Sequence, residues 1–460
     1  MISFHRLDQS RSARFRQLSR FLLIATLLLG ATPLYTVHAQ ETLAPTPPMG
    51  WNSWDAYGTT VTEAEVRANA DAMASGLKQY GWQYIVIDIQ WYEPNAAAHG
   101  YRPNAQLAVD GNGRLIPAAN RFPSSANGLG FKPLADYVHG KGLKFGIHIL
   151  RGIPRQAIAQ NLPVAGSTVH AADIADKQSL CKWNTDMYGV DMSKPGAQAY
   201  YDSIVALYAK WGVDFIKADD MARPYHEAEI AALHKAIVHS GRPMVLSLSP
   251  GPAPLDEVDH LRANAQMWRI EDDLWDNWGS LKNMYFRTEA WAPLVMPGHW
   301  PHADMLPLGR VGIRAERGDD RLSALSHDEQ KTLMTLWSIF RSPLIFGGDL
   351  PSLDPFTRSL MTNPDVIAVN QHSTGNKVAY KQGNISVWTA SAEQSRNKYI
   401  AVFNLGDSPA AIDLDWRQIG IGTIPEKVCD LWTGKCDVGS AALKFELAPH
   451  ASALFRSALK

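Results

Sequence analysis

The chain has 460 residues, of which 46 % are hydrophobic, enough for a large domain with a substantial core and a smaller second domain. Its 44 basic and 45 acidic residues give a net charge of −1, which argues against nucleic acid or an anionic membrane surface as a partner.

The first 39 residues have the pattern of a secretory signal peptide. Four arginines between Arg11 and Arg20 precede an apolar run over residues 21–31, and residues 37–39 form a small-residue cleavage pattern. The apolar run is short for a membrane span; an uncleaved peptide would instead be an anchor. We therefore expect a mature chain that begins near Gln40, is secreted or periplasmic, and does not contact a membrane after cleavage.

Residues 46–371 alternate between apolar strands and amphipathic helices. Thr62 and Glu65 form a capping box ahead of one such helix, and another is expected over Pro195–Trp211. Fully apolar strands between helices indicate a parallel sheet covered on both faces, and a (β/α)₈ barrel fits best. A doubly wound open sheet is the alternative, but no Gly-rich phosphate turn follows the first strand. The strand candidates are 46–54, 84–91, 143–150, 213–219, 243–250, 267–270, 295–305 and 343–349.

The pattern changes to short strands separated by Gly, Asp, Asn and Pro over residues 372–460, which predicts an antiparallel β-sandwich domain. Cys429 and Cys436 flank a hairpin-like segment, and an oxidising compartment would let them form a disulfide. Cys181 is then left over, and we expect a buried free thiol. The expected strands are 376–380, 385–390, 399–404, 411–413, 426–431, 442–446 and 453–456.

Acidic residues follow two of the barrel strand candidates. The strand before Asp219 ends in Lys217-Ala-Asp-Asp220, and a second acidic cluster lies within residues 268–275. Polar residues at the carboxyl ends of barrel strands are usually catalytic, and two carboxylates on neighbouring strand ends suit a retaining glycosidase. The alternative is a set of solvated acids, or ion pairs with Lys217 and Arg269.

Several motifs together resemble glycoside hydrolase family 27, which contains α-galactosidases and α-N-acetylgalactosaminidases. The resemblance runs from about Thr46 to the C-terminus. The motifs are residues 49–54, the strand end at Asp88, Lys217 with Asp219, Trp268-Arg269 with Asp273, 304–306 and 430–432.

The resemblance implies two catalytic residues. The nucleophile falls on Asp219, where the Lys217 ammonium would keep the carboxylate ionised; Asp220 is the competing candidate. The acid/base falls on Asp273, with Asp272 as its competitor, and it must be protonated before attack. The two carboxyl groups are then expected about 5–5.5 Å apart.

The resemblance also implies the groups that bind the sugar. Asp88 and Lys217 would hold its hydroxyls, Trp54 its apolar face and Arg269 its far hydroxyls. Asp304 would lie near the pocket floor, where a structural role is equally open. No metal-ligand or cofactor motif appears, and the chemistry of two carboxylates needs neither.

Four positions depart from the family pattern. Ile89 stands where most α-galactosidases have a second Asp that holds O6, a change that resembles members that cleave β-L-arabinopyranosides, because that sugar is galactose without C6. Ser249 lies where a Glu usually contacts the 2-hydroxyl, as in the N-acetylgalactosaminidase branch. His302 replaces a frequent Asp and His148 a frequent Tyr, and either could contact sugar, although His148 could equally be a core residue.

The sequence therefore predicts a retaining exo-glycosidase that releases terminal α-D-galactose from oligosaccharides or polysaccharides. The alternatives are a β-L-arabinopyranosidase, supported by Ile89, an α-N-acetylgalactosaminidase, and, in another class, a non-catalytic sugar-binding protein on the same fold.

Overall fold

The structure is a computed structural model that describes residues 43–459, so the expected signal peptide lies outside the described residues. The chain from Leu43 onward forms one compact unit. Between residues 43 and 459, no helix combines the length and the apolar character needed to cross a membrane.

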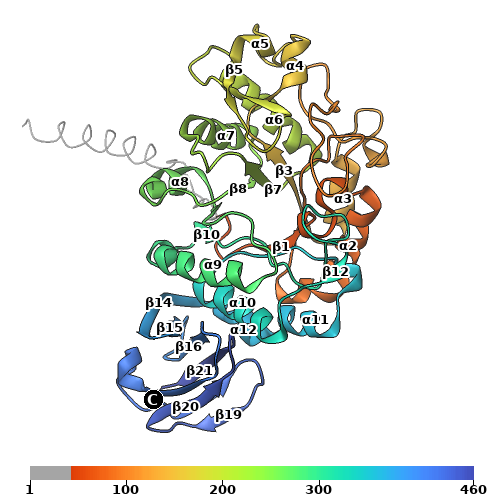
Figure 1. Ribbon diagram of the computed structural model, residues 1–460. Helices are drawn as coiled ribbons and strands as arrows, with labels where there is room; N and C mark the ends of the chain where they lie inside the picture. The colour runs from red at the N-terminus through yellow and green to blue at the C-terminus, as the bar shows by residue number, and fades with distance from the viewer. Residues whose placement is uncertain (1–42, 460) are drawn as a thin grey trace, which may run out of the picture. The chain divides into compact units, whose positions relative to one another are not determined.

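Eight parallel strands form a barrel in the order β10-β9-β8-β7-β3-β2-β1-β13, which confirms the predicted (β/α)₈ fold (Figure 1). Between β10 and β13 the ring closes through Leu306, whose N–H donates to the Ile345 carbonyl at 2.7 Å and which bridges to Phe346. The strands are β1 (Met49–Asn52), β2 (Tyr84–Ile87), β3 (Lys144–Leu150), β7 (Phe215–Asp219), β8 (Val245–Leu248), β9 (Met267–Arg269), β10 (Trp300–His302) and β13 (Leu344–Phe346).

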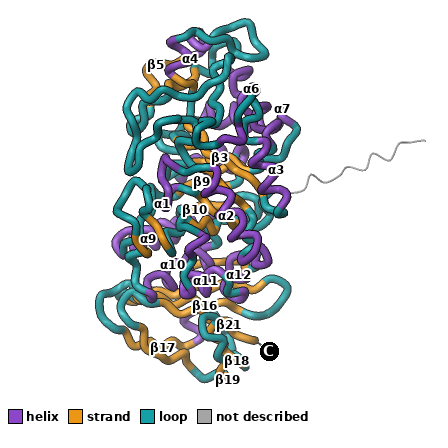
Figure 2. Tube along the Cα trace, turned by 90° about the vertical axis from the view of Figure 1, so that its right-hand side faces the viewer, coloured by secondary structure: helices purple, strands orange, loops and turns teal. Residues whose placement is uncertain are grey.

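Helices surround these strands (Figures 1 and 2). The capping box of Thr62 and Glu65 begins α2 as predicted, whereas α6 begins at Ala197, two residues later than expected, because Gly196 adopts a left-handed conformation (φ 87°). The helices are α1 (Trp54–Tyr57), α2 (Glu63–Gly76), α3 (Lys132–Gly140), α4 (Arg155–Ala159), α5 (Ala171–Ile174), α6 (Ala197–Trp211), α7 (Glu227–Ser240), α8 (Val258–Asn264), α9 (Trp278–Trp291), α10 (His327–Phe340), α11 (Pro355–Met361) and α12 (Pro364–Gln371).

Alternation along each strand places the site inside the barrel. Every second residue of a barrel strand faces inward. On β7 these are Phe215, which packs in an apolar layer, and then Lys217 and Asp219 toward the carboxyl end. The interior therefore changes from apolar to polar along the barrel axis. Neighbouring strands show the same change at Val86 and Asp88, Val245 and Ser247, Met267 and Arg269, and Trp300 and His302.

Two short sheets lie in connections between barrel elements. Their strands are β4 (Ile153–Pro154), β5 (Ala175–Leu180) and β6 (Met187–Val190), which form one sheet, and β11 (Arg310–Val311) and β12 (Arg321–Leu322), which form the other.

The C-terminal region forms the predicted antiparallel sandwich. A six-stranded sheet, β14-β15-β16-β21-β18-β19, packs against the β17–β20 pair over an apolar core that includes Val402, Leu414 and Trp416. The boundary between residues 371 and 372 stays a prediction. The strands are β14 (Ser373–Gln382), β15 (Ile385–Ala392), β16 (Lys398–Asn404), β17 (Ala410–Asp415), β18 (Lys427–Asp430), β19 (Cys436–Val438), β20 (Ala442–Leu447) and β21 (Ser452–Ala458).

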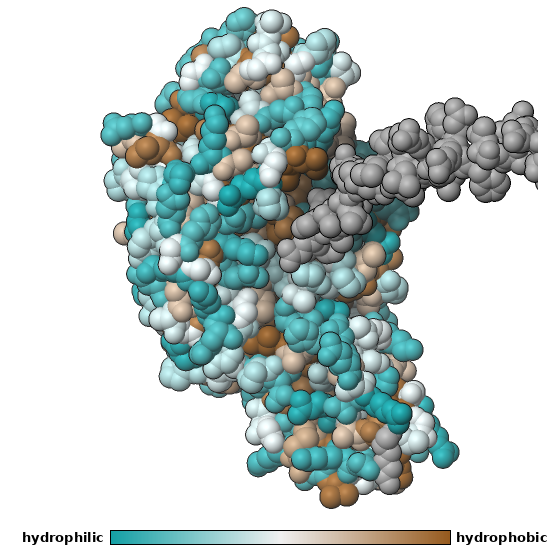
Figure 3. Space-filling view, turned by 180° about the vertical axis from the view of Figure 1, so that it is seen from behind, coloured by the Kyte–Doolittle hydropathy of each residue, from teal (hydrophilic) through white to brown (hydrophobic). Residues whose placement is uncertain are grey.

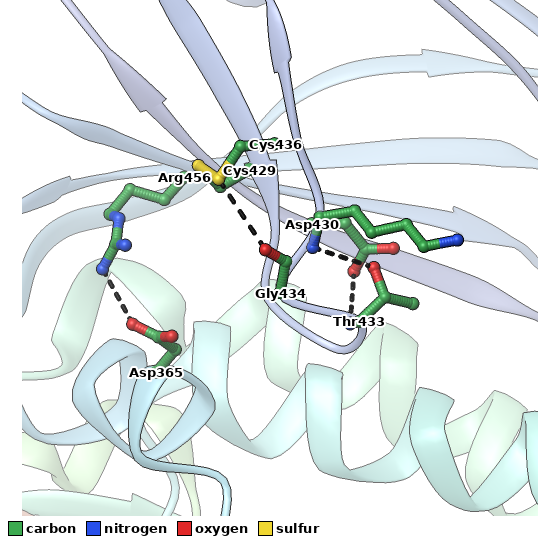
Figure 4. The surroundings of a disulfide bond; sticks show 8 residues. Asp365, Cys429, Asp430, Thr433, Gly434, Cys436 and Arg456 are labelled. Carbon is green, nitrogen blue, oxygen red and sulfur yellow. Dashed lines mark hydrogen bonds and ion pairs between the residues drawn. A yellow bond between two sulfur atoms is a disulfide. The ribbon is translucent and has the colours of Figure 1, made fainter.

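The expected disulfide joins β18 to β19. Cys429 and Cys436 face each other in the ladder and are bonded (Figure 4). Beside it, Arg456 of β21 forms an ion pair of 2.8 Å with Asp365 of α12, which links the sandwich to the helix before it.

The surface is mostly hydrophilic on the face that Figure 3 shows. Hydrophobic side chains lie there in small separate groups rather than in one broad patch. Isolated apolar residues of this kind are normal for a folded protein in water.

Candidate active site

An ion pair at the carboxyl end of the barrel joins two of the predicted sugar-binding residues. Lys217 donates to Asp88 at 2.7 Å, and Asn52 donates to the same carboxylate oxygen at 2.7 Å. Burial disfavours both charges, but their attraction prevails: the pKa of Asp88 is lowered and that of Lys217 is raised. The pair therefore stays charged inside the barrel.

Asp219 is held in its ionised form at the end of β7. Burial alone would raise its pKa, but the hydrogen bond and attraction of His148 (Nε2 to Oδ2, 3.1 Å), then the charge of Lys217, hold the pKa well below its ordinary value. His148 thus contacts this carboxylate. An ionised carboxylate at a strand end is what a nucleophile requires.

The neighbouring Asp220 faces elsewhere. Its carboxylate forms an ion pair of 2.8 Å with Arg151, which also binds Glu229 at 2.7 Å. Burial, followed by the partly opposing charge of Arg151, leaves the pKa of Asp220 at about 6. Between the two candidates for the nucleophile, this arrangement supports Asp219.

Asp273 lies after β9 and contacts Arg269, whose Nη2 is 3.1 Å from Oδ1. The side chain of Asp273 is 34 % exposed, so solvent and a leaving group can reach it. Asp272 is 54 % exposed and forms an ion pair with Arg223, and Glu271 forms one with Arg287. Of the three neighbouring acids, only Asp273 is tied to an inward-facing residue of the barrel.

Asp304 contacts both Arg269 and the backbone next to Asp273. It forms an ion pair of 2.7 Å with Arg269 and accepts a hydrogen bond of 2.7 Å from the N–H of Leu274, the residue after Asp273. Burial raises its pKa to about 6, although Arg269 opposes the shift. Asp304 therefore fixes both the Arg269 guanidinium and the backbone beside Asp273.

The three other predicted site residues are buried near these groups. Ser249 follows β8 and lines a small cavity together with Lys217, Arg269 and Asp304. Trp54 begins α1 and packs in the barrel core. Ile89 also packs in that core, directly after Asp88, and its N–H donates to Asp88 Oδ1 at 2.9 Å.

Two residues that sequence reasoning missed also belong to this region. Tyr101 stacks on Trp54 with ring centroids 5.9 Å apart. Burial, then the negative charges of Asp219 and Asp88, raises the pKa of Tyr101 well above its ordinary value. An aromatic residue in a long loop after a barrel strand was the available signal.

Asp55 is the second missed residue. It is 1 % exposed, and burial, then the charges of Asp304 and Asp273, raises its pKa well above its ordinary value. Burial and the surrounding carboxylates therefore favour the protonated form of this side chain. Its place in an otherwise aromatic motif, directly after Trp54, was the signal.

Neither thiol nor metal chemistry is indicated in the part of the chain that the structure describes. Cys181 is buried and unbonded, and burial, then Asp220, raises its pKa to about 12, so it remains a thiol. No group of three or more His, Cys, Asp or Glu residues in residues 43–459 lies where it could hold a metal ion.

Family models match both parts of the chain. Residues 46–194 and 190–372 match the model described as alpha galactosidase A, and residues 382–457 match the alpha galactosidase C-terminal beta sandwich domain. Over 85 % of its length the chain is 30 % identical to alpha-galactosidase 2 of Arabidopsis thaliana, of which the match covers 83 %.

Solved structures show higher identity. A family 27 β-L-arabinopyranosidase from Geobacillus stearothermophilus is 52 % identical, with a TM-score of 0.89 over 90 % of this chain and 97 % of that protein. A protein from Bacillus halodurans described as a putative α-N-acetylgalactosaminidase is 49 % identical, with a TM-score of 0.82 over 90 % and 97 %. The fold thus recurs in related proteins that are about half identical to this chain.

Proposed function

Because the chain belongs to glycoside hydrolase family 27, we propose that it is a retaining exo-glycosidase that hydrolyses terminal α-D-galactosyl residues. The observation that carries this proposal is the state of Asp219. Its pKa lies well below the ordinary value, and it occupies the end of a barrel strand beside Lys217, two conditions for a carboxylate nucleophile.

The proposed reaction has two steps. Asp219 attacks the anomeric carbon while Asp273 gives its proton to the departing glycosidic oxygen, which leaves a covalent glycosyl-enzyme. Asp273 then takes a proton from water, the water attacks the same carbon, and the Asp219 carboxylate is released. Both displacements invert the anomeric carbon, so the product keeps the configuration of the substrate.

Asp304 and Arg269 support the second acid in this scheme. Arg269 touches Asp273, and Asp304 holds Arg269 and the adjoining backbone in place. Asp88 and Lys217 form a fixed donor and acceptor pair that suits sugar hydroxyls.

A second substrate, a β-L-arabinopyranoside, is favoured by two observations. Ile89 stands where the family resemblance implies a second Asp that would hold O6, and the 52 % identical relative is a β-L-arabinopyranosidase. Since this pentose is galactose without C6, one pocket can accept both sugars. We expect both activities, with the higher kcat/KM on the pentoside, because galactose would bring an unpaired hydroxymethyl oxygen to an apolar side chain.

One comparison tests these assignments. The purified protein is assayed with aryl α-D-galactoside, aryl β-L-arabinopyranoside and aryl α-N-acetylgalactosaminide. Hydrolysis of the first two supports the proposal. Preference for the third would overturn the substrate, and no turnover of any of them would favour a non-catalytic sugar-binding protein.

The expected signal peptide indicates where the enzyme would act. A secreted or periplasmic enzyme would meet galactose-containing oligosaccharides or polysaccharides outside the cytoplasm, and the oxidised Cys429–Cys436 pair suits such a compartment. N-terminal sequencing of the protein recovered from the periplasm or the medium tests this: a start near Gln40 is expected, and an uncleaved N-terminus would contradict it.

A further inference from the structure

A cavity inside the barrel is lined by apolar side chains such as Phe215 and Met267 and by polar groups whose hydrogen-bonding capacity is unequally used. Its volume of about 20 Å³ accommodates a group the size of one water molecule. Asn52, Lys217 and Arg269 on its wall are already hydrogen-bonded or ion-paired to protein groups. The side chains of His302 and Ser249 on the same wall lack hydrogen bonds of normal geometry to any described residue.

His302 is the most incompletely paired of these residues. Its side chain lies at the carboxyl end of β10, where it is 5 % exposed, and neither ring nitrogen has a hydrogen-bond partner of normal geometry within residues 43–459. The hydroxyl of Ser249, a residue that is 1 % exposed, lies beside Asp219 and helps lower the pKa of that carboxyl, but no hydrogen bond of normal geometry satisfies it within residues 43–459. Buried polar groups are almost always paired, so this concentration requires an explanation.

The charge state of His302 determines what it can bind. Burial, then the positive charges of Arg269 and Lys217, lowers its pKa well below the ordinary value, while the backbone of Asp304 opposes the shift. The imidazole is therefore neutral, with one nitrogen that donates and one that accepts. A sugar hydroxyl, which also donates and accepts, can pair with either nitrogen.

We propose that His302 is a specificity-determining residue that, together with Ser249, recognises one hydroxyl of the bound sugar in a cavity too small for a larger substituent. This rests on the proposed function, since it assumes that a glycoside occupies the site. The sugar hydroxyl would supply the hydrogen-bond partner that His302 lacks in the free protein. An acetamido group in place of that hydroxyl would add three heavy atoms and would not fit.

Monodeoxy substrates test the assignment. The wild-type protein and His302→Ala are compared on aryl α-D-galactoside and on its 2-, 3-, 4- and 6-deoxy analogues. We expect His302→Ala to lose about 10- to 100-fold in kcat/KM on the parent substrate but to equal the wild type within about twofold on one analogue, the one that lacks the recognised hydroxyl. The analogue with an acetamido group at that same position should be hydrolysed at least 100-fold more slowly than the parent by the wild type.

Control variants separate recognition from folding. Ser338→Ala removes another buried, unpartnered hydroxyl, on α10 away from the cavity, and should not change the pattern across the analogues, whereas Ser249→Ala should affect the same analogue as His302→Ala. If His302→Ala does not fold, His302→Asn and His302→Gln replace it, because each keeps a donor and an acceptor group. Inhibition constants of the free sugar and of its deoxy forms then measure the same recognition as binding.

Two results would overturn the proposal. One is an equal loss on every analogue, which would make the cavity a structural water site. The other is no loss on the parent substrate. Inactivity of the wild type on both galactoside and arabinopyranoside would instead reject the proposed function.

Discussion

At the scale of single residues, the two members of each adjacent acid pair differ in their contacts. Asp219 is held ionised by His148, whereas Asp220 is tied to Arg151. Asp273 contacts Arg269, whereas Asp272 faces solvent. The sequence suggested these choices by resemblance, and the directions of the side chains supply a physical reason for them.

Substitutions at these positions give the first prediction. Asp219→Ala and Asp273→Ala should each reduce kcat by at least about 10³-fold, since the nucleophile and the proton donor act only in the transition state. Asp220→Asn and Asp272→Asn, the matched controls, should stay within about tenfold of the wild type. Azide should restore turnover of Asp219→Ala and give a glycosyl azide of inverted configuration. If Asp220→Asn or Asp272→Asn loses activity instead, the catalytic role belongs to Asp220 or Asp272, respectively.

Position 89 gives the second prediction. Ile89→Asp should raise the ratio of galactoside to arabinopyranoside kcat/KM by about 10- to 100-fold, because a carboxylate can accept a hydrogen bond from the C6 hydroxyl. Steady-state kinetics on the two aryl glycosides measure the ratio. Ile89→Val keeps an apolar side chain and serves as the control, and an unchanged ratio in Ile89→Asp would refute the explanation of this position.

At the scale of elements, strand alternation explains why several candidate site residues stand out in the sequence. Several apolar strands end in a polar residue on their inward face, so Lys217, Arg269 and Asp88 are visible as exceptions to an apolar pattern. Tyr101 and Asp55 could not be placed in the same way. Tyr101 lies in a long loop and stacks on Trp54, and the pKa of Asp55 is raised by burial and then by carboxylates distant in the sequence.

The connection after β7 gives a prediction about pH. Asp220 has a folded-state pKa of about 6, above its ordinary value. Between pH 4.5 and 6.5 the folded protein keeps a proton that the unfolded chain has released, so the contribution of Asp220 to the free energy of unfolding decreases as the pH rises.

Relative to Asp220→Asn, the free energy of unfolding of the wild type should therefore fall by about 1–2 kcal/mol across this interval. Urea unfolding at several pH values measures both proteins. A difference that is constant with pH, or that grows as the pH rises, would contradict the raised pKa.

At the scale of the whole molecule, the sandwich shares a hydrophobic core with the barrel. Successive residues of β15 face opposite ways: Val387 packs inside the sandwich, whereas Trp388 packs with the barrel core and donates to the hydroxyl of Tyr285 on α9 at 2.8 Å. The sequence predicted the sandwich from its short strands. It could not show which face of the sheet meets the barrel, because both faces are apolar.

This shared core predicts cooperative unfolding. Calorimetry should show one transition for the wild type, and Trp388→Ala should lower the free energy of unfolding by about 3–5 kcal/mol, as expected for loss of a fully buried aromatic side chain. Trp416→Ala, inside the sandwich core, is the comparison variant. Two separate transitions in the wild type would show that the domains unfold independently.

The central claim is that hydrolysis proceeds through two displacements at one anomeric carbon, with Asp219 as the first attacking group. The most direct measurement is a proton NMR time course of the wild-type reaction with the aryl glycoside that it cleaves best, recorded before the released sugar mutarotates. We predict that the first sugar to appear has the anomeric configuration of the substrate. First appearance of the opposite anomer would mean a single displacement by water and would contradict the account.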